Sequence, residues 1–219
     1  MFDANCLKLM FVAGSQDFYH IKGGKNDRIN ALLDTLELAL QSKITAFQFR
    51  QKGDLALQDP VEIKQLALEC QKLCQKYGVP FIVNDEAPLA LELKADGVHV
   101  GQEDMAIEEV ITLCKKRLFI GLSVNTLEQA LKARHLDGVS YLGVGPIFPT
   151  QSKKDKQVVG VELLKKIRDS GVKKPLIAIG GINTDNVSKL HEYGGIAVIS
   201  AITQAKDKAL AVGKLLNHA

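Results

Sequence analysis

The sequence has little excess charge of either sign and no long apolar run. Its 28 Lys and Arg residues stand against 25 Asp and Glu residues, so the formal net charge is only +3, and the basic residues are scattered among acidic ones. Because such a surface offers no continuous basic patch, we expect neither a nucleic acid nor a membrane as a partner. No stretch approaches the roughly 18 consecutive apolar residues of a membrane span, and the beginning of the chain lacks the pattern of a signal peptide. We therefore expect a cytoplasmic protein that binds small molecules through local clusters of polar residues.

Cysteine pairs and nucleophile motifs are also scarce. The four cysteines include one pair four residues apart, Cys70 and Cys74, but no second Cys or His pair stands at the spacing of a zinc site. We therefore predict that these thiols are buried. No serine lies in a G-x-S-x-G sequence and the histidines have no evident partners, so nothing indicates a nucleophilic triad. His99, inside an apolar segment, is interpreted as a hydrogen-bonded core residue, with a catalytic role as the alternative.

The sequence does contain a regular alternation of two kinds of segment. Short apolar, β-branched stretches alternate with longer ones, such as residues 29–40, whose apolar positions recur at helical spacing. The eight predicted strands cover residues 7–14, 45–50, 80–85, 97–101, 117–123, 140–145, 175–181 and 196–200. Strands separated by helices pair in parallel, and eight such units favour a closed barrel. With 46% hydrophobic residues, the 219-residue chain can bury one sizeable core. We predict an α/β protein with a single (β/α)8 TIM-barrel catalytic domain over residues 1–219.

An open, doubly wound sheet is the structural alternative. Such a sheet typically carries G-x-G-x-x-G in its first strand-to-helix turn, whereas here that turn reads VAGSQDF (12–18). The chain also has no low-complexity segment, long linker or tandem repeat that would indicate a second domain. We therefore favour the barrel, with helices beginning near Thr126, Val161 and Asn183.

Polar residues stand at the end of the second predicted strand, which reads Gln48-Phe49-Arg50-Gln51-Lys52. The carboxyl ends of parallel barrel strands meet on one face, so polar residues placed there converge. Period-two alternation puts Gln48, Arg50 and Lys52 on one side, which is the inner side if the phenylalanines face the helices. A Gln and an Arg are costly to bury unpaired in an apolar barrel. We interpret these three as donors of a site, with a solvated strand end as the alternative.

Two carboxylates follow the next two strands. Asp85 comes after Asn84 at the end of the third strand, and Asp104 lies just beyond the fourth. Carboxylate oxygens suit Mg²⁺, which typically takes one or two protein carboxylates together with substrate phosphates and waters. We predict that Asp85 and Asp104 hold Mg²⁺. Taken alone, Asp104 is equally consistent with a cap of the next helix.

The last three strands end in segments suited to phosphate. Residues 145–155 contain hydroxyls, backbone N–H groups and lysines, and the seventh and eighth strands lead into Gly180-Gly181 and Ser200. Barrels frequently bind a phosphate on these last two loops. The glycine pair is equally consistent with a tight corner. Ser123, at the end of the fifth strand, is consistent with either a functional hydroxyl or a helix cap.

These strand-end motifs, taken in order, resemble those of the thiamine-phosphate synthase family, also called thiamine-phosphate pyrophosphorylase. The motifs are QFRQK (48–52), VND (83–85), GVHVGQED (97–104), GLS (121–123), GVGPIFPTQSKK (143–154), AIGGI (178–182) and VIS (198–200). They span nearly the whole chain, and although each is weak alone, seven in order are specific. The resemblance implies an enzyme of thiamine biosynthesis. It would join 4-amino-2-methyl-5-hydroxymethylpyrimidine diphosphate to a thiazole phosphate, or to its carboxylated form, and release thiamine monophosphate and diphosphate.

The resemblance also implies roles for individual residues. Mg²⁺ would be held by Asp85 and Asp104. The two substrates would be bound by Gln48, Phe49, Arg50, Gln51, Lys52, Asn84, Ser123, Thr150, Gln151, Ser152, Lys153, Gly181, Ile199 and Ser200. The catalytic residues would be Arg50, Lys52, Ser123 and Lys153. Such groups suit a dissociative substitution, in which the leaving diphosphate needs stabilisation more than the reaction needs a base.

Two features depart from the family pattern or lie outside it. Ser152 stands where family members often have Thr, which keeps the hydroxyl. The polar segment 14–28 is consistent with a lid or with a disordered loop, and we assign no roles to it.

Two other functions are carried as alternatives: a thiazole tautomerase of the same fold, which lacks the full diphosphate-binding set, and a non-catalytic protein that binds thiamine intermediates. The complete set of charged residues favours the synthase, and the oligomeric state is left open.

Overall fold

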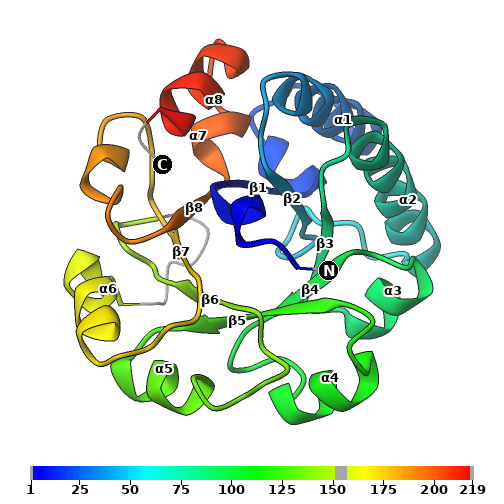
Figure 1. Cartoon of the computed structure of the whole chain (residues 1–219). Helices are drawn as coiled ribbons and strands as arrows, with labels where there is room; N and C mark the ends of the chain where they lie inside the picture. Colours follow the sequence, from blue (N-terminus) through cyan, green and yellow to red (C-terminus); the bar gives the residue numbers. More distant parts are fainter. Residues whose placement is uncertain (1, 151–156, 218–219) are drawn as a thin grey trace.

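Eight parallel strands form a closed barrel in the computed structural model, which describes residues 2–150 and 157–217. The strands pair in chain order from β1 to β8, and β8 closes the ring by pairing with β1. Figure 1 looks along the barrel and shows the helices outside the ring of strands. The prediction of a (β/α)8 TIM barrel is confirmed, and the alternative of an open sheet is wrong.

Each strand lies at or close to its predicted position. The strands are β1 (Leu9–Ala13), β2 (Ala46–Phe49), β3 (Phe81–Asn84), β4 (Gly97–Val100), β5 (Phe119–Val124), β6 (Tyr141–Val144), β7 (Leu176–Ile179) and β8 (Gly195–Val198). The α-helices are α1 (Lys25–Gln41), α2 (Pro60–Tyr77), α3 (Ala87–Glu92), α4 (Ile107–Cys114), α5 (Leu127–Ala133), α6 (Gly160–Asp169), α7 (Ser200–Thr203) and α8 (Lys208–Leu216). Three 3-10 helices complete the set: η1 (Ala4–Leu7), η2 (Ser15–Phe18) and η3 (Val187–Lys189). Among the described residues, none of the helices combines the length and the apolar character that a bilayer crossing requires.

Strand β2 shows how alternation divides the side chains between the two faces of the barrel wall. Phe47 and Phe49 are 0% and 2% exposed, and both pack in the layer between strands and helices. Gln48 therefore points into the barrel, where its amide lies 3.4 Å from the Met10 sulfur. The inward orientation expected for Gln48 follows directly from the burial of its two neighbours.

Local capping signals decide where the helices begin. Thr126 accepts a hydrogen bond from the Gln129 N–H at 3.2 Å, and α5 begins directly after it as predicted. The helix expected near Asn183 is reduced to the three-residue η3. The side chain of Asn183 accepts hydrogen bonds from the N–H groups of Asp185 and Asn186, and so closes a turn where an α-helix would have to start.

The close pair of cysteines lies inside the fold. Cys70 and Cys74, on α2, are both 0% exposed and are free thiols. Burial raises the pKa of each thiol, so both stay protonated. Protonated, inaccessible thiols are poor nucleophiles and poor metal ligands. The prediction of buried thiols is therefore confirmed for Cys70, Cys74 and Cys114, whereas Cys6 is only partly buried.

The amino-terminal segment fills one end of the barrel. The ring of Phe2 lies 5.2 Å from that of Phe119 and 6.1 Å from that of Tyr141, measured between centroids. Helix η1 contacts β1 and β8 at the same end. Because side chains occupy this end, the opposite end, where the carboxyl ends of the strands emerge, is the one left for a site.

Candidate active site

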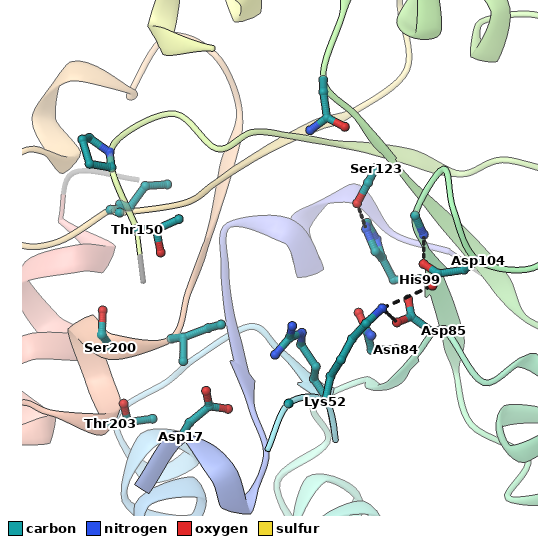
Figure 2. Close-up of a pocket in the computed structure, with 18 of the residues that line it drawn as sticks. Asp17, Lys52, Asn84, Asp85, His99, Asp104, Ser123, Thr150, Ser200 and Thr203 are labelled. Atoms are coloured by element: carbon teal, nitrogen blue, oxygen red, sulfur yellow. Dashed lines mark hydrogen bonds and ion pairs between the residues drawn. The ribbon is translucent and has the colours of Figure 1, made fainter. Parts of the chain in front are cut away.

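The carboxyl ends of the strands surround a cleft of about 860 Å³. Figure 2 shows polar side chains that face one another across it, and every strand or the segment after it contributes to the lining. A smaller cavity of about 70 Å³ adjoins the cleft inside the barrel and is lined in part by Gln48 and Tyr141. The arrangement brings together residues that are far apart in the sequence, as expected for this face of a barrel.

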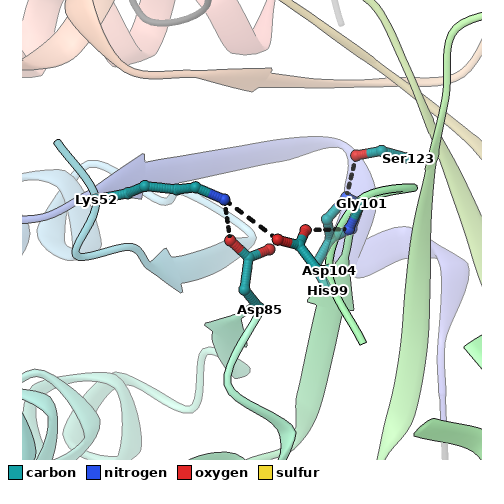
Figure 3. Close-up of polar contacts among 6 residues, drawn as sticks. All are labelled: Lys52, Asp85, His99, Gly101, Asp104 and Ser123. Carbon is teal, nitrogen blue, oxygen red and sulfur yellow. Dashed lines mark hydrogen bonds and ion pairs between the residues drawn. The ribbon is translucent and has the colours of Figure 1, made fainter. Parts of the chain in front are cut away.

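Three charged side chains, Lys52, Asp85 and Asp104, form what we call the carboxylate cluster. Lys52 Nζ lies 2.7 Å from Asp85 Oδ2 and 3.3 Å from Asp104 Oδ1 (Figure 3). The predicted pair of carboxylates is thus brought together around one cation. The Lys52 side chain is 53% exposed, and ion pairs as exposed as this add at most about 1 kcal/mol to stability. The cluster is therefore better explained by binding than by folding.

The backbone around each carboxylate holds it in place. Asp85 has a φ of 65°, in the left-handed region that Asn and Asp tolerate better than most residues, and its N–H donates to the His99 carbonyl at 2.8 Å. Asp104 Oδ2 accepts a hydrogen bond from the Gly101 N–H at 2.8 Å. A Cβ atom at position 101 would lie 2.7 Å from that same oxygen, so glycine permits the approach. Asp104 does not cap the next helix, because α4 begins only at Ile107.

The two carboxyl groups have pKa values shifted in opposite directions. Burial raises the pKa of Asp85, the nearby Asp104 raises it further, and Lys52 opposes both only in part. Burial also acts on Asp104, but its hydrogen bonds with Asp85 and Gly101 and the charge of Lys52 outweigh burial and lower its pKa. Burial tends to lower the pKa of Lys52, yet the two carboxylates outweigh it and raise that pKa. The repulsion between the two carboxylates, which contributes to the raised pKa of Asp85, would be relieved by a further cation.

Arg50 and Asn84 add hydrogen-bonding groups beside the carboxylate cluster, and both line the cleft. The backbone carbonyl of Arg50 is held by the Gln16 side chain at 2.8 Å. Burial raises the pKa of the Asp17 carboxyl. The Arg50 guanidinium lies close enough to Asp17 for its positive charge to lower this pKa in part. A guanidinium in an open cleft offers several N–H donors for phosphate oxygens.

A hydrogen-bonded chain runs from the cleft into the barrel. His99 Nε2 lies 2.9 Å from Ser123 Oγ, and His99 Nδ1 lies 2.9 Å from Tyr141 Oη. His99 is 8% exposed, so the interpretation as a hydrogen-bonded core residue is confirmed, although the residue also lines the cleft. Ser123 lies within β5, which excludes the helix-cap alternative, and its hydroxyl reaches the cleft.

The wall opposite the carboxylate cluster carries hydroxyls and a glycine corner. Thr150 and Ser200 lie on it (Figure 2). Ile199 and Gly181, which precede Ser200 and follow β7, respectively, also line the cleft. Gly181 has a φ of 64°, and a Cβ atom on it would lie 2.4 Å from the carbonyl oxygen of Pro149. Only glycine allows the segments after β6 and β7 to approach this closely. Hydroxyls and exposed backbone in such a corner suit the oxygens of a single phosphate.

Some residues named from the sequence do not reach the cleft. Phe49 is packed between the strands and the helices, as described above. Gln51 Oε1 accepts hydrogen bonds from the Leu57 N–H at 3.1 Å and from the Ser15 hydroxyl at 3.3 Å. Gln51 therefore orders the segment after β2. The predicted residues Gln151, Ser152 and Lys153 lie outside the described part of the chain.

Several residues that line the cleft were not predicted from the sequence. Asp17 and Tyr19 reach the cleft because η2 folds the segment after β1 against it. Gln204 Nε2 donates to Tyr19 Oη at 2.8 Å across a separation of 185 residues. Thr203 Oγ1 is buried without a hydrogen-bond partner among the described residues. Asp17 could have been identified from a local sequence signal, because its carboxylate accepts a hydrogen bond from the N–H of Gly14, three residues earlier. The contact of Tyr19 with Gln204 has no such signal, because it depends on the closure of the barrel.

Comparison with known proteins agrees with this geometry. A family model described as thiamine monophosphate synthase matches residues 18–202. Thiamine-phosphate synthase of Helicobacter pylori (strain Shi470) is 91% identical over 219 residues, which cover 100% of both chains. Thiamine-phosphate synthase of Pasteurella multocida (strain Pm70) is 52% identical over 216 residues, which cover 97% of this chain and 96% of the relative.

A solved structure gives the same result. Thiamine phosphate pyrophosphorylase from Pyrococcus furiosus superimposes with a TM-score of 0.81 at 36% sequence identity, over 98% of this chain and 96% of that one. Sequence matches at this identity over nearly the whole length show common family membership, and the shared fold supports it. The chain therefore belongs to the thiamine-phosphate synthase family and is an enzyme of that family.

Proposed function

We propose that the cleft joins 4-amino-2-methyl-5-hydroxymethylpyrimidine diphosphate to hydroxyethylthiazole phosphate, or to its carboxylated form, and releases thiamine monophosphate and diphosphate, together with carbon dioxide when the carboxylated form is used. The observation that carries this proposal is the division of one cleft between two different walls. The carboxylate cluster and Arg50 suit a diphosphate accompanied by a cation. The hydroxyls and glycine corner opposite suit a single phosphate. Two phosphorylated substrates held side by side fit a joining reaction.

The carboxylate cluster fits Mg²⁺ by the chemistry of its donors. Asp85 and Asp104 present carboxylate oxygens that already share one cation, the ammonium of Lys52. The described residues contain no group of three or more His, Cys, Asp and Glu side chains arranged for a metal. Substrate phosphates and waters would therefore complete the coordination that the two carboxylates begin. Bound there, Mg²⁺ would stabilise the negative charge of the leaving diphosphate.

The chain's own residues would orient the substrates and meet the charge that develops. Arg50 and Lys52 would donate to diphosphate oxygens as the bond to the pyrimidine methylene breaks, and donors that meet growing charge favour the transition state over the ground state. The aminopyrimidine can carry the developing positive charge, and the thiazole nitrogen is already a nucleophile, so no general base is required. Asn84 and Ser123 would hold the pyrimidine diphosphate. Roles for Phe49, Gln51, Gln151, Ser152 and Lys153 are proposed from the family resemblance alone.

The wall opposite would fix the second substrate. Thr150, Ser200 and Gly181 would hold its phosphate, with Ile199 against the thiazole, so that the ring nitrogen faces the methylene carbon. Such positioning turns a reaction between two molecules into one within a complex, which removes much of the entropic barrier.

An assay with both substrates tests the proposal. We expect purified protein with Mg²⁺ to form thiamine monophosphate and diphosphate in equal amounts, and to form neither after the metal is removed with EDTA. Reactions that lack one substrate are the controls. Failure of folded protein to give either product from both substrates would contradict the proposal. Isomerisation of the thiazole alone would indicate a tautomerase, and binding of both substrates without turnover would indicate a non-catalytic binder.

A further inference from the structure

Tyr141 starts a hydrogen-bonded chain that ends at the cleft. The phenol is 0% exposed and lies inside the barrel, with its Oη 2.9 Å from His99 Nδ1. The other ring nitrogen of His99 lies 2.9 Å from Ser123 Oγ, a contact that Figure 3 shows. The three residues come from β6, β4 and β5, which are adjacent in the barrel wall. A buried hydroxyl that touches no solvent is thus connected to a hydroxyl that lines the site.

The partners at the buried end set the direction of this chain. A phenol has one proton to donate, and the hydrogen bond that the structure shows for the Tyr141 hydroxyl is to His99 Nδ1, at 2.9 Å. Burial also raises the pKa of Tyr141, so the phenol keeps that proton. A ring nitrogen that accepts from a phenol carries no proton of its own, so neutral His99 is protonated on Nε2 and donates to Ser123 Oγ. The Ser123 proton is then directed away from the imidazole and toward the cleft.

Two glycines make room for the chain. A Cβ atom on Gly121 would lie 2.2 Å from Tyr141 Cζ and 2.3 Å from His99 Nδ1. A Cβ atom on Gly143 would lie 2.8 Å from His99 Cε1. Neither glycine has a positive φ, so it is space and not backbone conformation that requires glycine at these positions. The close packing holds the imidazole in one orientation between Tyr141 and Ser123.

From this geometry we propose that Tyr141 is a positioning residue, which fixes the protonated nitrogen of His99 and thereby makes Ser123 a hydrogen-bond donor to the substrate. The group that accepts the Ser123 hydrogen bond is an oxygen or ring nitrogen of the pyrimidine diphosphate, and for this identity the inference rests on the proposed function. With the proton on Nδ1 instead, the Ser123 hydroxyl would donate to His99, and the cleft would lose this donor.

The protonated nitrogen of His99 can be observed directly in the full-length enzyme labelled with ¹⁵N-histidine. Long-range N–H correlation spectra distinguish the two neutral tautomers, and the signal that His99→Asn removes assigns the residue. We expect His99 to be protonated on Nε2 in the wild type and to lose this single form in Tyr141→Phe. A proton on Nδ1 in the wild type, or an unchanged His99 signal in Tyr141→Phe, would overturn the proposal. No substrate is added, so this result is independent of the proposed reaction.

Kinetics test whether Tyr141 acts through Ser123. Tyr141→Phe keeps the ring that packs near Phe2 and Phe119 and removes only the hydroxyl. We expect kcat/KM for the pyrimidine diphosphate to fall about tenfold, the size of one hydrogen bond, with KM for the thiazole phosphate little changed. In a Ser123→Ala background the same substitution should cost less than about twofold, because the group it positions is gone. Equal costs in both backgrounds would overturn the proposal.

A matched control is available on the surface. Tyr77→Phe removes a phenol that contacts Gln41 and Glu37 on the outside of the barrel, and it should leave both kinetics and the His99 signal unchanged. Circular dichroism checks that each variant is folded. If Tyr141→Phe does not fold, the proposal is tested by which ring nitrogen of His99 carries the proton in the wild type, since Nδ1 would overturn it. If the wild type gives no product, the proposed function fails, and the spectrum still decides the role of Tyr141.

Discussion

Single residues of the cleft hold their charges in place before any ligand binds. Asp104 is fixed by its own loop through the Gly101 N–H, and Asp85 is held in a left-handed conformation that costs energy. Residues held in such conformations are often functional, since folding alone does not require them. The ammonium of Lys52 compensates the two carboxylates in the absence of another cation. Substitutions in the carboxylate cluster are therefore expected to change activity more than stability.

Asp104→Ala is expected to affect metal-dependent turnover above all. With one carboxylate left, the affinity for Mg²⁺ falls, and we expect kcat at a fixed Mg²⁺ concentration to drop by at least about tenfold, with partial recovery as Mg²⁺ is raised. Steady-state rates measured across a Mg²⁺ titration test this. Glu108→Ala, on the first turn of α4, is the control and should behave as the wild type. A near-normal kcat/KM in Asp104→Ala would refute the role of this carboxylate.

Arg50→Ala is expected to remove stabilisation of the leaving diphosphate. The loss should resemble that of a single oxyanion-stabilising donor, roughly 3 kcal/mol or about 100-fold in kcat/KM. Arg134→Ala removes an exposed guanidinium whose Nε donates a hydrogen bond to the neighbouring His135, and it serves as the matched control. Initial rates with both substrates give the comparison. Equal rates for Arg50→Ala and the control would mean that Arg50 does not touch the reacting group.

Asp17→Asn tests the electrostatics of the cleft by stability. Burial raises the pKa of Asp17, so the folded state binds this proton more tightly than the unfolded state does. Ionisation of Asp17 therefore lowers the stability of the folded protein. This loss is absent below the ordinary pKa of a carboxyl group, and it appears as the pH rises through the raised pKa of Asp17 in the folded state. We expect Asp17→Asn to melt at or above the wild-type temperature near about pH 7, and to lose this advantage near about pH 3.5. Calorimetry at both pH values measures it, and a lower melting temperature near neutrality would contradict the assignment.

Secondary-structure elements were predictable from sequence to the extent that each is encoded locally. The eight strands were found because short apolar runs mark segments buried on both faces, and Thr126 marked the start of α5 because its cap lies within one turn. Asn183 misled the prediction, since the same side chain that caps a helix also closes a turn. The approach of Tyr19 to Gln204 has no local signal, because it exists only once the barrel has closed.

Residues that line the cleft were predictable where chain direction alone places them. Arg50, Asp85 and Ser200 lie at the carboxyl ends of strands, which all point to one face, so their convergence follows from the topology. Gln51 follows the alternation of β2 and faces away from the cleft, which the position of its motif did not reveal. The link from Tyr141 through His99 to Ser123 was not anticipated, because it depends on the register of three neighbouring strands.

Gly181→Ala probes the corner between the segments after β6 and β7. A Cβ atom there meets the Pro149 carbonyl at 2.4 Å on a backbone with a positive φ, so we expect a loss of about 1–3 kcal/mol in the free energy of unfolding. We also expect a raised KM for the thiazole phosphate. Gly213→Ala, in α8 with open space around it, should instead stabilise the protein by roughly 0.5–1 kcal/mol. Urea denaturation of both variants makes the comparison, and similar effects at the two glycines would show that the corner is not tightly packed.

The whole molecule places the two walls that we propose to bind anions at the open end of a barrel whose other end is filled. Side chains from η1 and Phe2 occupy the amino-terminal end, and strand pairing that closes on itself fixes the eight carboxyl ends around one cleft. Neither wall is built from a single element, so the distance between the walls is set by the barrel as a whole. A rigid separation of this kind would position the two proposed substrates for a joining reaction.

Simultaneous binding at the two walls is the central claim, and calorimetric titration of hydroxyethylthiazole phosphate tests it most directly. The titration is carried out with the enzyme alone and again with the enzyme saturated with Mg²⁺ and diphosphate. Separate walls predict that the thiazole phosphate binds in both cases, with dissociation constants that agree within about tenfold, which is 1.4 kcal/mol of coupling. Loss of thiazole phosphate binding in the presence of saturating magnesium diphosphate would show that the two anions compete for one site, and would contradict the claim.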